Sequence, residues 1–353
     1  MSTPKRIFVK GNEAISRGAL AAGMKCFFGY PITPQNDIPE FLSSALVEAG
    51  GEFVQAESEV AAANMLMGAA ACGIRAMTSS SSPGMSLKQE AISYMAGSEI
   101  PGVIVNVSRG GPGLGDIGPS QGDYFQAVKG GGHGDYKLLV LAPGTVQEAY
   151  DLTMKAFDLA FKYRNPVLVL ADAIIGQMKE PVVPRVPENR DPEEGQDWGL
   201  QGAKGRDPRL IKSLFLDDGA LADQNLKLQA KYKAMQAEVD QELFLTEDAE
   251  LIVVAFGSIG RIAKSTIRKL RAQGHKVGLV RPITLFPFPS EVLLDLAKQG
   301  KRFLTIEHNM GQMVEDVRLA IRTVADSAFH AQLPGNLPTP DDFEEPILKA
   351  LEG

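Results

Sequence analysis

Short apolar runs alternate with helix-length segments from the N-terminal region to about Asp172, and this pattern constrains the fold more than any other feature. It predicts a parallel sheet whose strands are joined by crossover helices. The expected strands cover residues 25–29, 52–55, 75–78, 102–107, 137–141 and 167–171, and the expected helices include 36–49, 59–71, 86–96 and 145–163. We therefore predict a doubly wound α/β domain over residues 1–178.

A second, smaller α/β domain is expected near the C-terminal end of the sequence. Residues 179–197 contain repeated prolines, which remove backbone donors and disfavour helix, so we interpret them as a linker. Residues 218–243 have a polar helical pattern, typical of a connecting helix on a surface. The alternation of strands and helices then resumes at Glu250 with LIVVAFG, KVGLVRP and RFLTIEH. The predicted divisions are 1–178, 179–246 for linker and connecting helix, and 247–353.

Composition narrows the class of protein. At 353 residues the chain is too long for one typical core, and its pI of about 5.3 argues against nucleic-acid binding. The first residues lack the apolar stretch of a secretory signal and no run is long enough to span a membrane, so we expect a cytoplasmic protein. Two cysteines, Cys26 and Cys72, are interpreted as buried thiols. An iron-sulfur cluster needs about four, so this chain cannot hold one alone.

Four segments follow consecutive predicted strands, where an open parallel sheet places its ligands. They are YPITP at 30–34, the acids Glu57 and Glu59, SSSSPGM at 79–85, and the loop of residues 108–123 that begins with Ser108 and Arg109. Three of these segments also have a purely structural interpretation. The acids can simply begin a helix, the serines can form a turn, and Arg109 can belong to a structural ion pair as readily as it can clamp a carboxylate.

Other motifs carry weaker signals. The glycine-dense loop of residues 110–122 has neither dinucleotide nor P-loop spacing. His133 has no second ligand at metal-binding spacing, so we predict no metal site on this chain. The segment FGSIGRIA at residues 256–263 is similar to a strand-turn-helix phosphate site, although such a segment is more often only a tight turn.

Taken together, YPITP, the ESE acids, SSPGM and the Arg109 loop resemble the alpha subunit of 2-oxoacid:ferredoxin oxidoreductases. The resemblance extends over essentially the whole chain and includes GPGLGDIGPSQGDY, GGGHGDY, RPITLFPFP and EHNMGQM. It is greatest for the branched-chain type, which acts on 3-methyl-2-oxobutanoate, with the 2-oxoglutarate type as a near neighbour. It implies a thiamine diphosphate pyrimidine-binding domain followed by a transketolase C-terminal-like domain.

The resemblance also implies roles for individual residues. Glu59 matches the catalytic glutamate that contacts N1′ of the thiamine pyrimidine, and its spacing to Gly84 favours it over Glu57. Thr33 matches the threonine beside the substrate, and Pro31 belongs to the same cofactor-facing turn. Arg109 matches the arginine that binds the substrate carboxylate. The serines of SSSSPGM depart from the family pattern and receive no role.

The family's activity is oxidative decarboxylation of a 2-oxoacid with coenzyme A and reduction of ferredoxin. Thiamine enzymes hold the diphosphate through a metal on a GDG segment, and GDG does not occur in this sequence. Thiamine diphosphate is therefore expected to be shared with a beta subunit that carries the diphosphate and Mg²⁺. The iron-sulfur clusters are expected on partner subunits, among them gamma and a ferredoxin-like delta subunit, and the chain alone is expected to be inactive.

Two other functions remain open from the residues. One is the pyrimidine-side subunit of a different split thiamine enzyme, such as a lipoamide-linked dehydrogenase, which would need no ferredoxin. The other is a scaffold subunit without a catalytic role, in which Glu59 only begins a helix. Ferredoxin reduction separates the first from our interpretation, and substitution of Glu59 separates the second.

Overall fold

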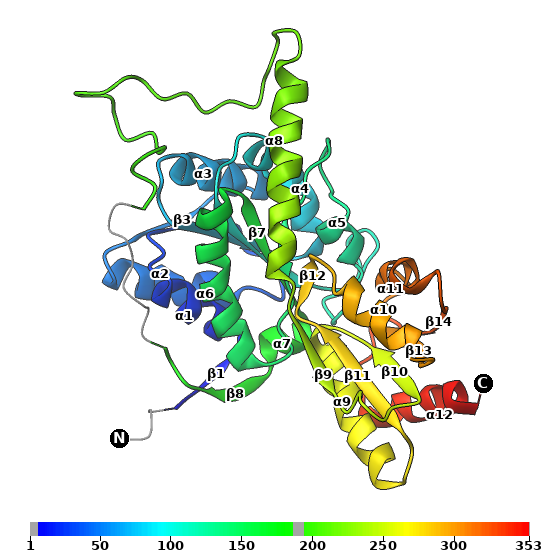
Figure 1. Ribbon diagram of the computed structural model, residues 1–353. Coiled ribbons are helices and arrows are strands. Elements are labelled where there is room, and N and C mark those ends of the chain that lie inside the picture. Colours follow the sequence, from blue (N-terminus) through cyan, green and yellow to red (C-terminus); the bar gives the residue numbers. More distant parts are fainter. Residues whose placement is uncertain (1–5, 186–193, 353) are drawn as a thin grey trace, which may run out of the picture.

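The computed structural model describes residues 6–185 and 194–352, and Figure 1 shows three sheets with flanking helices in this part of the chain. The strands are β1 (Ile7–Lys10), β2 (Cys26–Gly29), β3 (Glu52–Gln55), β4 (Ala76–Ser80), β5 (Gly102–Ser108), β6 (Leu139–Leu141), β7 (Pro166–Asp172), β8 (Lys179–Val182), β9 (Gln241–Phe244), β10 (Leu251–Val254), β11 (Val277–Pro282), β12 (Thr284–Phe286), β13 (Arg302–Glu307) and β14 (Ser327–Ala331). The α-helices are α1 (Gly11–Ala21), α2 (Asp37–Glu48), α3 (Glu59–Ala71), α4 (Ser82–Gly97), α5 (Tyr124–Val128), α6 (Val146–Tyr163), α7 (Ala173–Gln177), α8 (Ala220–Ala234), α9 (Gly257–Ala272), α10 (Ser290–Lys298), α11 (Met313–Ile321) and α12 (Glu344–Glu352). Two 3-10 turns, Met235–Glu238 and Pro340–Phe343, complete the elements.

The larger sheet has the strand order β12-β6-β7-β5-β4-β2-β3, and its pairings are parallel except for that of β12 with β6. Helices α3 and α4 pack together on one face, whereas α1 packs against α2 and α6 in the opposite layer. This arrangement confirms the predicted doubly wound α/β fold. The six expected strands agree with the observed ones to within two residues at each end.

The second sheet has the order β14-β13-β10-β11-β9, with β9 antiparallel to β11. One of its faces packs on α9 and α12 in a small separate core, while Ile252 and Val254 of β10 belong to the large core of the first sheet. Strand β9 corrects one expectation, because the predicted connecting helix of residues 218–243 includes 241–243, which are strand. Helix α8 ends at Ala234, and the chain then enters the sheet.

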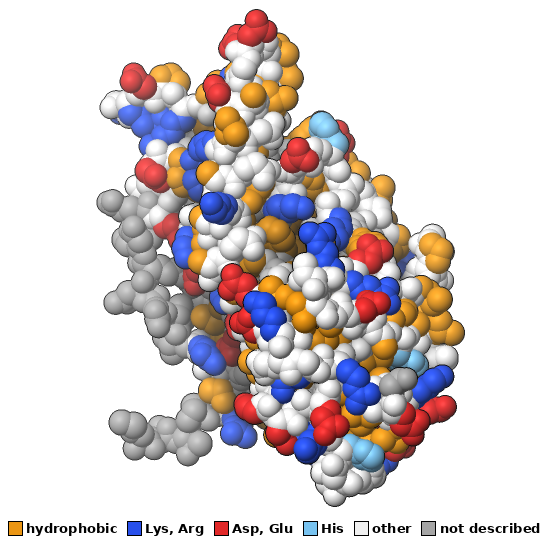
Figure 2. All heavy atoms as spheres, turned by 45° about the vertical axis from the view of Figure 1, so that its right-hand side comes forward, with side chains coloured by type: hydrophobic (Ala, Val, Ile, Leu, Met, Phe, Trp, Pro, Cys, Tyr) orange, Lys and Arg blue, Asp and Glu red, His pale blue; other side chains and the backbone are white. Residues whose placement is uncertain are grey.

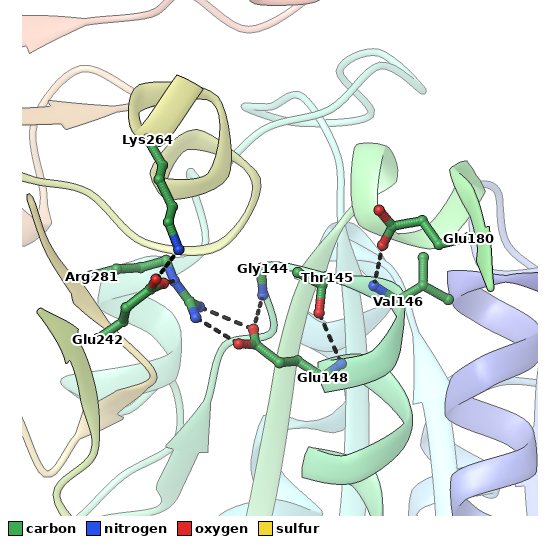
Figure 3. A network of polar contacts seen from close by, with 8 residues as sticks. All are labelled: Gly144, Thr145, Val146, Glu148, Glu180, Glu242, Lys264 and Arg281. Atoms are coloured by element: carbon green, nitrogen blue, oxygen red, sulfur yellow. Dashed lines mark hydrogen bonds and ion pairs between the residues drawn. The ribbon is translucent and has the colours of Figure 1, made fainter. Parts of the chain in front are cut away.

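The two sheets are interlocked by the chain segments that connect them. Strand β12 follows β11 of the second sheet but pairs with β6 of the first. Arg281 of β11 is 4% exposed and forms a bidentate pair with Glu148 of α6 at 2.6 and 3.0 Å and a bond to Glu242 of β9 at 2.8 Å. Figure 3 shows this buried guanidinium between carboxylates from the two parts of the fold. The sheets are thus held in one arrangement by charge-assisted hydrogen bonds.

Part of the predicted linker forms a β-strand. Its first residues form β8, which pairs antiparallel with β1 in a two-stranded sheet, so 179–182 is strand and not linker. Residues 186–193 of that linker lie outside the described residues. The two cysteines also differ from expectation, since Cys26 and Cys72 are free but only partly buried.

An arm projects from this body, formed by residues 199–219 and the N-terminal part of α8 (Figures 1 and 2), whereas Leu228 and Tyr232 further along α8 are buried in the large core. Several of its large apolar side chains are exposed, with Leu210 at 78%, Leu216 at 83% and Leu226 at 70%. Among the described residues, no helix combines the length and the apolar character that crossing a bilayer requires.

Candidate active site

The four candidate segments meet at one edge of the larger sheet. Strands β3, β2, β4 and β5 are neighbours and run parallel, so the residues that follow them lie at the same edge. Pro31 and Thr33 follow β2, Glu59 follows β3, the serines end β4 and begin α4, and Arg109 follows β5. The topology therefore brings together every site residue that the sequence predicted.

Glu59 is the buried acid of the ESE segment. It is the first residue of α3 and is 7% exposed, whereas Glu57 lies two residues earlier and is exposed. The Ser58 hydroxyl caps the helix by accepting from the Ala61 N–H at 3.2 Å. Ser58, and not Glu59, therefore caps the helix. Among the described residues none donates a hydrogen bond to the Glu59 carboxylate, so its oxygens remain available to a ligand.

A glycine and the Ser80 hydroxyl lie beside this carboxylate. A Cβ atom on Gly84 would fall 2.6 Å from Glu59 Oε1 and 2.2 Å from Ser80 Oγ, so only glycine allows α4 to approach so closely. The hydroxyls of Ser80 and Ser81 are buried without a hydrogen-bond partner among the described residues. Buried polar atoms usually find partners. An unengaged carboxylate next to an unpaired hydroxyl fits an aminopyrimidine, which offers both ring nitrogens and an amino group.

Arg109 connects two of the loops. Its guanidinium donates from Nη1 to the Thr33 carbonyl at 2.9 Å and from Nη2 to the Leu114 carbonyl at 3.0 Å, and it is 7% exposed. Its Nε–H is buried without a partner among the described residues. No carboxylate among the described residues pairs with this guanidinium, and its Nε–H is a donor without an acceptor there. The Thr33 and Pro31 side chains are exposed beside it.

The Asp123 carboxylate connects the segments that carry the site. Asp123 Oδ2 accepts hydrogen bonds from Ser82 at 2.6 Å, Asn106 at 2.8 Å and Ser108 at 3.0 Å. Ser82 Oγ in turn accepts from the Arg109 backbone N–H at 2.9 Å. These contacts join the end of β5 to the start of α4 and fix the loop that carries Arg109.

The same glycine-rich loop docks on the second sheet. Gln121 donates from its backbone to the His308 carbonyl at 2.9 Å and from its side chain to the Phe256 carbonyl at 3.0 Å. Asn309 Nδ2 donates back to the Gln121 carbonyl at 2.9 Å. The EHNMGQM and FGSIGRIA motifs therefore contact this loop, and both help to hold it in place.

Sequence reasoning missed several residues of this region. It left Ser80 and Ser81 without a role, and it did not single out Asp123 or Lys88, which lies fully buried next to Glu59. A lysine beside a leucine on a helix ordinarily faces solvent, so no local signal marked it. His133 lies in a loop as predicted, and the described residues contain no group of three or more potential metal ligands from His, Cys, Asp and Glu.

Two family models match this chain, one over each part of the fold. Residues 17–242 match the family described as pyruvate flavodoxin/ferredoxin oxidoreductase, thiamine diphosphate-binding. Residues 249–343 match pyruvate:ferredoxin oxidoreductase core domain II.

Two curated relatives illustrate the similarity. The chain is 55% identical over 315 residues to the ketoisovalerate oxidoreductase subunit VorB of Methanothermobacter marburgensis, covering 88% of this chain and 89% of that protein. It is 34% identical over 377 residues to the 2-oxoglutarate synthase subunit KorA of Methanothermobacter thermautotrophicus, covering 97% and 98% of the two.

Among solved structures, the fold is similar to a 2-oxoglutarate:ferredoxin oxidoreductase from Magnetococcus marinus. The TM-score is 0.85 at 24% identity, covering 99% of this chain and 66% of that one. A split-gene transketolase shares the fold at a TM-score of 0.60 and 15% identity, covering 98% of each chain. The family matches and the relatives together show that this chain belongs to the 2-oxoacid:ferredoxin oxidoreductase family, as one of its thiamine diphosphate-binding subunits.

Proposed function

We propose that this chain supplies the pyrimidine half of a thiamine diphosphate site in a ketoisovalerate:ferredoxin oxidoreductase, with Glu59 as the activating carboxylate. The observation that carries the proposal is the position of Glu59, buried at the start of α3 with unengaged oxygens and a glycine of α4 against them. Bound thiamine diphosphate supplies the carbon nucleophile that attacks the 2-oxo carbon of the substrate.

The residues of this chain have separate tasks in the proposal. Glu59 shares a proton with N1′ of the pyrimidine and so controls the basicity of the amino group across the ring. The guanidinium of Arg109 holds the C1 carboxylate of the 2-oxoacid, and Thr33 lies beside the substrate. Pro31 shapes the turn against the cofactor. The Asp123 contacts keep Arg109 oriented while the substrate enters.

The proposed domains follow the same division. Residues 1–178 bind the pyrimidine, 179–246 connect the two parts, and 247–353 form the transketolase C-terminal-like domain. The family matches fall on either side of residue 246, which supports this boundary. The strands β8, β9 and β12 cross between the parts, so the domains are proposed as sequence units and not as independently folding ones.

The proposal places the remaining cofactor groups on other subunits. A beta subunit holds the diphosphate and Mg²⁺, while gamma and ferredoxin-like delta subunits carry the iron-sulfur clusters and pass electrons to ferredoxin. Coenzyme A accepts the acyl group, and the assembly works in the cytoplasm. Exposed apolar side chains border the candidate site, with Leu87 at 53%, Leu114 at 80% and Ile117 at 61%, and such a border suits a protein partner.

Substitution of the two acids in the assembled complex tests the role of Glu59. We expect Glu59→Gln to slow exchange of the cofactor C2 proton and to reduce turnover by orders of magnitude, because a carboxamide can hydrogen-bond but cannot supply the charge. Glu57→Gln is the matched control and should change both little, since Glu57 is exposed. Equal effects of the two substitutions, or a larger effect at Glu57, would refute the assignment.

Reduction of ferredoxin or a viologen with different 2-oxoacids tests the substrate. We expect 3-methyl-2-oxobutanoate to give a higher kcat/KM than pyruvate or 2-oxoglutarate, because an apolar pocket disfavours a second, unpaired carboxylate. A preference for 2-oxoglutarate would replace the branched-chain assignment with the alternative that the more distant 34% identical relative represents. Decarboxylation without any ferredoxin reduction would favour another split thiamine enzyme.

A further inference from the structure

Lys88 is a fully buried lysine that the proposed chemistry does not yet use. It lies on α4 at 0% exposure, although its neighbour Leu87 is 53% exposed. The helix therefore turns its charged residue inward and its leucine outward, against the usual preference of both. An inverted pair of this kind is costly to folding, and its position next to Glu59 points to a role in the site.

The contacts of Lys88 reach β4 and the start of α3. Its Nζ donates to the Thr78 hydroxyl at 2.9 Å and to the backbone carbonyl of Glu59 at 3.4 Å. Thr78 Oγ1 in turn donates to the Phe28 carbonyl at 2.6 Å. The ammonium thus connects α4 to β4 and to the backbone of the candidate catalytic acid.

Among the described residues, Glu59 is the charged group that interacts with the Lys88 ammonium. Burial lowers the pKa of Lys88 to about 8, and the negative charge of Glu59 opposes this decrease. Of the elements packed on α4, strands β4 and β5 contain no ionisable side chain, and β7 contains only Asp172, which bonds Ser258 and the Ile175 N–H. On α4 itself, Glu90 and Tyr94 are exposed and bond each other.

We propose that Lys88 is a positioning residue that acts through Glu59: it anchors the Glu59 backbone to β4 and places a positive charge in the buried site beside the Glu59 side chain. This inference rests on the proposed function, because it assumes that Glu59 contacts the pyrimidine. An opposite charge in a poorly solvated site favours the ionised form of its neighbour. With Lys88 charged, a proton shared between Glu59 and N1′ is held on the nitrogen.

The inference predicts a particular dependence on pH. Lys88 loses its proton as the pH rises through about 8, and the support for the Glu59 carboxylate is lost with it. The rate of C2 proton exchange should therefore fall above that pH in the wild-type complex. Replacing Lys88 should remove this inflection, because no group is left to titrate there.

The first experiment measures C2 proton–deuterium exchange of thiamine diphosphate in the assembled complex across the pH range. In Lys88→Met we expect the exchange rate at neutral pH to be at least roughly tenfold below the wild-type rate, equivalent to about one pKa unit of lost interaction. We also expect its pH profile to lack the wild-type inflection. Lys88→Arg keeps its charge at high pH, so its rate should not fall there. Lys301→Met is the matched control, since Lys301 is also buried but binds three carbonyls far from the site.

The second experiment needs no cofactor and follows denaturant unfolding of the full chain as a function of pH. A lysine with a lowered folded-state pKa binds fewer protons than in the unfolded chain between about 8 and the ordinary 10.5. Wild-type stability should therefore rise through this window relative to Lys88→Met. In Glu59→Gln the rise should begin at lower pH, because the opposing charge is gone.

The outcomes distinguish a wrong role for Glu59 from a wrong role for Lys88. If Glu59→Gln leaves the C2 exchange unchanged, the proposed function itself fails. If Glu59→Gln stops the exchange while Lys88→Met keeps the wild-type pH profile, the proposed function stands and the inference about Lys88 is wrong. A stability onset that Glu59→Gln does not move would also overturn it, since Lys88 would then be a purely structural residue.

Discussion

At the scale of single residues, the candidate site is decided by which side chains at the strand ends are buried. Two acids lie two residues apart, and α3 begins so that Glu59 is covered while Glu57 is exposed. The sequence allowed this choice, because the spacing from Glu59 to Gly84 matched a family pattern. It could not reveal Lys88 or the unpaired hydroxyls of Ser80 and Ser81, since their burial depends on how α4 rotates against the sheet.

Arg109 offers the sharpest test of substrate binding at this scale. Losing a charge-assisted pair with the C1 carboxylate usually costs about 2–5 kcal/mol, so Arg109→Met should lower kcat/KM roughly tenfold or more for every 2-oxoacid. The order of preference among side chains should survive. Steady-state viologen reduction with a panel of 2-oxoacids measures both effects.

A control is needed because Arg109 also bonds two loop carbonyls, at Thr33 and Leu114. Arg109→Lys retains a charge but not the planar donor edge, and it should recover only part of the lost kcat/KM. Unchanged kcat/KM in Arg109→Met would refute the clamp. A loss that follows thermal stability across both variants would assign the residue to loop structure instead.

At the scale of elements, the local sequence pattern was sufficient to predict the strands in the middle of the large sheet. Central parallel strands are apolar runs bounded by turns, so β4, β5 and β7 could be predicted from sequence. Strands β8, β9 and β12 could not, because they lie at sheet edges and their partners are distant in sequence. Strand β8 even contains Pro181, which an edge position tolerates.

The Arg281 network in Figure 3 is the clearest element-scale contact to test. Breaking a buried ion pair from one side leaves carboxylates uncompensated and typically costs about 3–5 kcal/mol. Glu148 is 27% exposed and also accepts from the Gly144 N–H at 2.7 Å, so we expect Arg281→Met to lower the free energy of unfolding by about 3 kcal/mol.

Denaturant unfolding of the full chain measures this change. Arg185→Met is the matched control, because Arg185 pairs with Asp151 while its side chain is 63% exposed, and such surface pairs contribute about 0–1 kcal/mol. Similar effects of the two substitutions would show that burial of Arg281 does not strengthen the connection between the sheets.

At the scale of the whole molecule, the chain has the surface of a subunit. Large apolar side chains are exposed on the arm and around the candidate site, among them Leu210, Leu216 and Leu114. A free monomer rarely leaves so many uncovered. The family could be predicted from the sequence because its motifs lie in short segments that follow the strands. The polar pattern also predicted a surface helix at α8, but not that it and residues 199–219 project from the body, because a projecting segment follows no core pattern.

Titration calorimetry of the isolated chain with thiamine diphosphate and Mg²⁺ tests the claim that this chain carries only half of the cofactor site. Our account predicts weak binding or none, because the groups that hold the diphosphate and metal are proposed to lie on a partner. Adding the partner subunit should then produce tight, Mg²⁺-dependent binding that Glu59→Gln alters. Tight, Mg²⁺-dependent binding to the chain alone would contradict the account.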